Sequence, residues 1–177
     1  ITGAASNDTI TGNSGVDSIN GGKGADSITG GTGADVFTYT AVNQSTTNSF
    51  DNISDWTTGT DEIDITLNYS SISNAVDINA VILTAAAGTS AAQDSLSGKR
   101  GEAIYDKTNE KLLINFNGDN LFTTQDYAIK IAEASTEANS VVAGDLNFSI
   151  TGTTGNDTIV AGGGEDTIVG GSGTDSI

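Results

Sequence analysis

The 177-residue chain contains no cysteine, histidine, methionine or proline. Without cysteine it can form neither a disulfide framework nor a thiolate metal site. Without histidine it lacks the usual zinc ligands and the most common general base. No apolar run is long enough to span a membrane, and no signal peptide is recognised. A β-protein without disulfides needs another stabilising cross-link, and a bound metal ion is the obvious one.

Basic and aromatic residues are also scarce. The chain has 6 Lys and Arg against 23 Asp and Glu, which gives a net charge of −17, and only 6% of its residues are aromatic. This charge repels nucleic acid and anionic lipid, so neither is expected as a partner. The same charge attracts divalent cations, and its self-repulsion weakens the compact state. We therefore expect that the protein needs metal ions in order to fold.

The chain contains one sequence twice. Residues 1–28 and 150–177 align without a gap at an offset of 149, and 16 of the 28 positions are identical. A long internal period of this kind is typical of tandem repeat proteins. It predicts that the chain is one unit of a larger array. We expect its ends to stack on neighbouring copies or on continuing repeats, which would give an extended polymer.

A second period of nine residues runs inside each copy. Each nonapeptide has aspartate in its sixth column, a large apolar residue in its eighth column and, with few exceptions, glycine in its first. Glycine provides the positive φ angles of a tight turn, and the apolar residue would point inward from a short strand. Two units complete one coil, so units n and n+2 stack. The sixth-column aspartates are Asp8, Asp17, Asp26, Asp35, Asp157, Asp166 and Asp175.

The nonapeptide resembles the G-G-x-G-x-D-x-U-x repeat of RTX proteins, which forms a parallel β-roll. The resemblance implies a calcium ion between units n and n+2, which pairs Asp8 with Asp26, Asp17 with Asp35, and Asp157 with Asp175. Asp166 would then need a partner beyond Ile177 or from another chain. Calcium takes six to eight oxygen ligands, whereas magnesium keeps its waters. The glycines whose turns would add carbonyl ligands are Gly21, Gly24, Gly30, Gly33, Gly170 and Gly173.

A metal-free alternative also remains open, in which the aspartates are only turn residues of a solenoid. Some units depart from the repeat. Ala4, Ser6, Thr153 and Ala161 stand where glycine is expected, so calcium binding at the outermost turns is in doubt. Asn13 also replaces glycine, but asparagine tolerates the left-handed conformation.

The segment after Phe37 resembles the region that follows the last roll turn in serralysin-type secreted proteases. The resemblance implies a cap on the roll, with Asp51 and Asp55 completing calcium sites. For Asp61, Glu62 and Asp64 we prefer a solvated acidic loop. The residues that carry the resemblance are Asp51, Ile53, Asp55, Trp56, Gly59, Asp61, Ile63 and Asp64.

The remaining segments also read as β-structure. A hairpin is predicted from strands at 102–106 and 111–116, with further strands at 126–132 and 146–150, and a short helix near 79–87. The predicted fold class is therefore all-β. It consists of a parallel β-roll at 1–38, a β-sandwich-like capping domain at 39–149 and the start of a second roll at 150–177.

No catalytic constellation is visible, so the chain is not expected to be an enzyme. The leading hypothesis is an extracellular, calcium-binding structural repeat module of a bacterial surface layer, adhesin, matrix fibre or filament, exported by type I secretion. The alternative is the RTX region of a secreted protease or lipase whose catalytic domain lies elsewhere. A soluble calcium buffer or toxin fragment has no feature in its favour.

Overall fold

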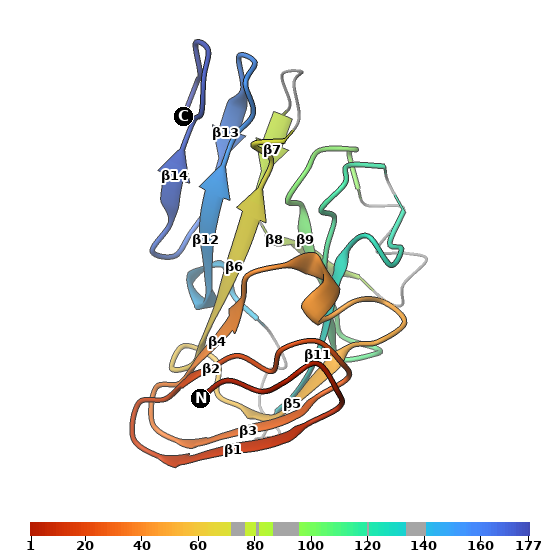
Figure 1. Cartoon of the computed structure of the whole chain (residues 1–177), viewed down its shortest axis with the longest axis vertical. Helices are drawn as coiled ribbons and strands as arrows, with labels where there is room; N and C mark the ends of the chain where they lie inside the picture. The colour runs from red at the N-terminus through yellow and green to blue at the C-terminus, as the bar shows by residue number, and fades with distance from the viewer. Residues whose placement is uncertain (72–76, 81, 87–95, 120, 134–140) are drawn as a thin grey trace.

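The computed structural model describes residues 1–71, 77–80, 82–86, 96–119, 121–133 and 141–177 (Figure 1). Within them the chain forms strands and two short 3₁₀ turns, η1 (Val42–Gln44) and η2 (Ala143–Asp145), and no α-helix, which confirms the all-β prediction. The strands are β1 (Thr9–Ser14), β2 (Ser18–Ile19), β3 (Ser27–Thr32), β4 (Val36–Tyr39), β5 (Asp51–Trp56), β6 (Glu62–Asn68), β7 (Asp77–Asn79), β8 (Ile82–Ala86), β9 (Ala103–Asp106), β10 (Lys111–Ile114), β11 (Tyr127–Glu133), β12 (Leu146–Thr151), β13 (Thr158–Val160) and β14 (Thr167–Val169).

The first roll is built from two parallel ladders, one on each side of the coil. On one side β1, β3 and β5 are neighbours, and Ile10 pairs with Ile28, which pairs with Ile53. On the other side β2, β4 and β6 are neighbours. The eighth-column residues are almost fully buried between the ladders, at 7% exposure for Ile10 and 1% for Ile28. The predicted stacking of units n and n+2 is therefore confirmed.

The middle of the chain extends the first ladder. Strand β11 pairs in parallel with β5, and β10 and β9 follow in antiparallel order, with β8 at the sheet edge. The predicted hairpin and the strands at 126–132 and 146–150 are confirmed. The predicted helix near 79–87 is wrong for the residues described there, because β7 ends at Asn79 and β8 pairs with β9 through Ile82 and Leu83. Pairing with a neighbouring strand overrides the helix propensity of this alanine-rich segment.

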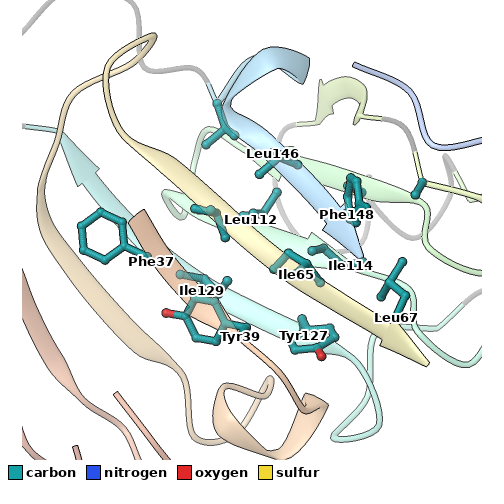
Figure 2. Close-up of a cluster of buried hydrophobic side chains, with 14 of the residues drawn as sticks. Phe37, Tyr39, Ile65, Leu67, Leu112, Ile114, Tyr127, Ile129, Leu146 and Phe148 are labelled. Atoms are coloured by element: carbon teal, nitrogen blue, oxygen red, sulfur yellow. The ribbon is translucent and has the colours of Figure 1, made fainter. Parts of the chain in front are cut away.

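One hydrophobic core joins the roll to the middle region. Figure 2 shows side chains from β4, β6, β10, β11 and β12 converging on this core. Tyr39 and Tyr127 meet edge to face, with ring centroids 6.5 Å apart, and Tyr127 Oη donates to the carbonyl of Thr66 at 2.9 Å. These contacts fix the middle region directly against the last coil of the roll.

The second roll begins on the same sheet on which the first roll ends. Strand β12 pairs in parallel with β6, β14 pairs with β12, and β13 pairs with β7. The resulting sheet has the order β14-β12-β6-β4-β2, so the two rolls occupy opposite edges. In Figure 1 the first roll lies at the foot of the view and the second at the upper left. The division into units at 1–38, 39–149 and 150–177 stays a prediction. Both of its boundaries are crossed by sheets that join strands of neighbouring units.

No helix in the described part of the chain has the length and apolar character needed to cross a membrane.

Candidate metal centre

The aspartates of the first ladder form a stack linked by hydrogen bonds. The backbone N–H of Asp8 donates to Oδ1 of Asp26 at 2.8 Å, and that of Asp26 donates to Oδ1 of Asp51 at 2.9 Å. The N–H of Asp51 donates to Ser45 Oγ at 2.8 Å, where the stack ends. Asp51 therefore occupies the position of a repeat aspartate, although it lies outside the regular nine-residue period.

The second ladder carries an equivalent stack. The N–H of Asp17 donates to Oδ1 of Asp35 at 3.0 Å, and that of Asp35 donates to Oδ1 of Asp61 at 3.1 Å. Asp61 is only 4% exposed, and Glu62 and Asp64 lie within β6, so the expected solvated acidic loop is wrong for all three. One signal could have identified Asp61, because Gly59 precedes it by two residues and the inward-facing Ile63 follows it by two, as in a repeat unit.

The second roll repeats the arrangement and contains a unit that the sequence analysis missed. The N–H of Asp157 donates to Oδ1 of Asp175 at 2.9 Å. Oδ1 of Asp166 accepts instead from the N–H of Phe148 at 2.8 Å. Residues 143–151 thus form a degenerate nonapeptide in which Phe148 takes the aspartate column and Ile150 points inward. Its aspartate is missing from the sixth column, so the motif was not recognised.

Three aspartates of the two stacks have a second carboxylate oxygen that is buried. Oδ2 of Asp17 and Asp26 is buried without a hydrogen-bond partner, and the buried carboxyl of Asp51 has the Tyr39 hydroxyl beside it. Burial raises the pKa of Asp26, and burial followed by the nearby charge of Asp26 raises the pKa of Asp51 to about 7. A buried carboxylate oxygen without a donor is costly, and a cation would satisfy it.

The turns bring carbonyl oxygens close to the same aspartates. A Cβ atom built on Gly3 would lie 2.1 Å from the carbonyl oxygen of Gly21, and one on Gly24 would lie 2.8 Å from that of Ser6. The same pattern recurs in the other turns: Gly30 faces Gly12, Gly33 faces Gly15, Gly170 faces Gly152 and Gly173 faces Gly155. All six glycines predicted to contribute carbonyl ligands therefore lie where adjacent turns meet.

Glycine is required in these turns for two reasons. Gly31 has φ +108°, and a Cβ there would lie 1.9 Å from the carbonyl oxygen of Asn13. A Cβ on Gly21 would lie 2.3 Å from Oδ2 of Asp26, the oxygen that has no partner. A side chain at either position would separate the coils or displace the carboxylate. Asn13 itself has φ +82°, as expected for an asparagine in place of glycine.

Asp55 lies beside the second stack, and its part in a calcium site stays a prediction. Its two oxygens accept from the N–H groups of Gly30 at 2.9 Å and Gly31 at 2.8 Å. Its charge contributes to the raised pKa of Asp61, although burial is the main cause of that shift. Asp55 thus anchors the turn that carries Asp35, next to the Asp35–Asp61 pair.

The donor set fits a hard cation. No group of three or more acidic side chains gathers around one point in the described ranges. Each pair of stacked turns brings together two carboxylates, and carbonyl oxygens are the other donors nearby. An oxygen-only set of mixed carboxylates and carbonyls suits calcium. It does not suit zinc, which prefers nitrogen and sulfur ligands.

Stacked glycine-rich turns, inward-facing apolar residues and paired aspartates define a calcium-binding parallel β-roll of the RTX class. Comparison with known families agrees, since residues 149–177 match the RTX calcium-binding nonapeptide repeat (4 copies). Residues 1–143 match the family model described as peptidase M10 serralysin C terminal. The chain therefore belongs to the serralysin C-terminal family. No curated protein matches the chain.

These matches confirm both predicted resemblances and the prediction that calcium is the bound ion, because RTX nonapeptide repeats bind calcium. The matched serralysin region is the non-catalytic C-terminal part of such proteases. Both kinds of domain are typical of extracellular proteins exported by type I secretion.

Proposed function

We propose that the chain is a structural repeat module of an extracellular surface layer, adhesin, matrix or filament protein. It folds and associates with neighbouring copies when calcium binds outside the cell. The observation that carries this proposal is the stacking of Asp26 on Asp51, two buried carboxylates of which Asp26 Oδ2 has no partner and Asp51 has only the Tyr39 hydroxyl beside its side chain. Without a cation this arrangement concentrates negative charge where water cannot screen it.

The calcium sites lie between stacked turns, each with two carboxylates and with carbonyl oxygens of the turn glycines. An aspartate in the middle of a stack, such as Asp26, serves the turn below and the turn above. Neighbouring calcium sites of one stack therefore share an aspartate, and calcium binds to them as a linked series and not independently. The proposed carboxylate pairs are Asp8–Asp26, Asp26–Asp51, Asp17–Asp35, Asp35–Asp61 and Asp157–Asp175.

Composition supports folding after export. The net charge of −17 opposes compaction where free calcium is low, and calcium removes that obstacle where it is abundant. The chain has no proline that must isomerise and no cysteine that must be oxidised, so neither slow step delays folding.

The alternative is the RTX region of a secreted protease or lipase whose catalytic domain lies in another part of the protein. The match of residues 1–143 to the serralysin C-terminal family favours it. The duplication at an offset of 149 residues favours the structural module. The parent sequence distinguishes them, since it carries either more copies of this module or a catalytic domain.

Calcium titration of chelator-treated protein tests the proposal. Far-UV circular dichroism should report a cooperative gain of β-structure with calcium and little gain with magnesium. Asp26→Asn should weaken the response, whereas Asp119→Asn, at an exposed loop position outside the stacks, should not. A spectrum that chelation leaves unchanged would overturn the proposal.

A further inference from the structure

The two copies of the 28-residue sequence make the same contacts. The N–H of Gly3 donates to the carbonyl of Asn20 at 2.8 Å, and the N–H of Gly152 donates to that of Val169 at 2.8 Å. The aspartate bonds agree as well, at 2.8 Å from Asp8 to Asp26 and 2.9 Å from Asp157 to Asp175. Residues 150–177 therefore repeat the structure that residues 1–28 form at the start of the first roll.

The two copies have neighbours on different sides. In the first copy, β2 is followed along the sheet by β4, which pairs Ser18 with Val36 and Ile19 with Phe37. In the second copy, β14 occupies the place of β2 and is preceded by β12, and β13 occupies the place of β1 and is preceded by β7. The first copy thus shows which strand follows β2 along the sheet, and the second copy shows which strand precedes it.

From this we infer that the β4 strand of a following copy of the repeat pairs with the free edge of β14. This inference rests on the proposed structural function. The strand order β2-β4-β6-β12 then repeats, and one parallel sheet runs without a break through successive copies. Each copy adds four strands, which at a spacing of about 4.8 Å corresponds to about 19 Å of sheet per 149 residues.

Two features of the β14 edge fit this occupant. Ile19 is 1% exposed beneath Phe37, whereas Ile168, in the same column, is only partly buried in this structure. A following β4 strand would cover Ile168 with its own Phe37. Asp166 has Phe148 upstream in the aspartate column, so it lacks a second carboxylate there. Asp35 of the following copy would supply it, as Asp35 does for Asp17.

A cysteine cross-link tests the register, and the chain has no cysteine that could interfere. The tandem protein consists of residues 1–177 followed directly by a second 29–177, because Ile177 occupies the place of Ile28. The test pair is Thr167→Cys in the first copy with Val36→Cys in the second. Their Cα atoms should lie about 4.8 Å apart, within the range that a disulfide spans.

Two control pairs calibrate the cross-link. Ser18→Cys with Val36→Cys in residues 1–177 joins residues already paired in the structure. Thr167→Cys with Thr38→Cys of the second copy is displaced by two residues, which puts the Cα atoms about 8 Å apart and beyond disulfide reach.

With calcium, the test pair should cross-link as completely as the paired control, and the displaced pair should not. A tandem protein that gains β-structure with calcium but cross-links no better at the test pair than at the displaced pair would overturn the inference and leave the proposed function intact. Failure of calcium to change the circular dichroism of residues 1–177 would overturn the proposed function itself.

Discussion

Ser45 Oγ accepts a hydrogen bond from the backbone N–H of Asp51 at 2.8 Å and donates to the carbonyl oxygen of Ala128 at 2.5 Å. This hydroxyl ties the backbone of Asp51, the last aspartate of the stack, to β11 of the middle region. The regular roll and its cap are therefore connected next to a fully buried carboxyl group.

Ser45→Ala should destabilise the protein by about 1–3 kcal/mol, because two buried backbone groups lose their partner. Urea unfolding in calcium measures the effect, and Ser49→Ala at an exposed position is the control. If both variants unfold at the same urea concentration, Ser45 does not secure the stack.

Asp26→Asn should weaken calcium binding more than Asp8→Asn, since Asp26 contacts both Asp8 and Asp51 whereas Asp8 begins the stack. We expect the midpoint of the calcium titration to move at least about tenfold further for Asp26→Asn, equivalent to about 1.4 kcal/mol. Equal midpoints for the two variants would contradict the proposed stacking of sites.

Gly31→Ala should prevent tight coil stacking, because a residue at φ +108° with a Cβ 1.9 Å from a carbonyl oxygen has no relaxed alternative. The left-handed conformation alone costs about 1–2 kcal/mol, and the clash adds to it. Thermal unfolding in calcium should show a lower midpoint. Gly144→Ala is the control, since a Cβ there meets nothing within 4 Å.

In calcium-free protein the free energy of unfolding should fall as pH rises from about 4 to about 7. Asp51 has a pKa of about 7 in the fold against an ordinary value of 3.8, so the folded state binds more protons than the unfolded chain across this window. Burial raises the pKa of Asp126 and Asp145 as well, with the same sign of effect.

Far-UV circular dichroism in chelator at a series of pH values measures this dependence, because protein that has lost its β-structure without calcium near pH 7 should regain it as Asp51 is protonated. Asp51→Asn should flatten the dependence. Saturating calcium should remove the fall, because the bound ion favours the ionised carboxylate. A calcium-free stability that rises across the window would show that Asp51 is not buried as described.

Much of the roll could be predicted because its period is strict. The nine-residue spacing is enough to place Ile10 over Ile28 and Asp8 beside Asp26, since stacking follows from two units per coil. The pairing of Asp26 with Asp51 could not be derived from spacing, because 25 residues replace the regular 18. That position came from the family resemblance instead.

The misses have one cause. Asp61 follows Asp35 at an irregular distance, and Phe148 stands in a column defined by aspartate, so neither unit registers as a repeat. Contacts that link residues far apart in sequence, such as Leu146 with Ile63, place both units. Around Asp61 the local pattern gives only the weak signal of Gly59 and Ile63, and around Phe148 it gives none, because the surrounding sheet determines the conformation there.

Because every strand in the order β14-β12-β6-β4-β2 runs parallel to its neighbour, the two edges of that sheet differ. A two-fold axis would make two copies of one edge strand antiparallel, whereas the parallel pairing proposed above between β14 and the β4 strand of a following copy joins copies head to tail. In this proposed arrangement growth has a direction, and a chain of copies has distinct leading and trailing ends. Such a chain lengthens without closing into a dimer, and a molecule blocked at one edge would terminate growth at that end alone.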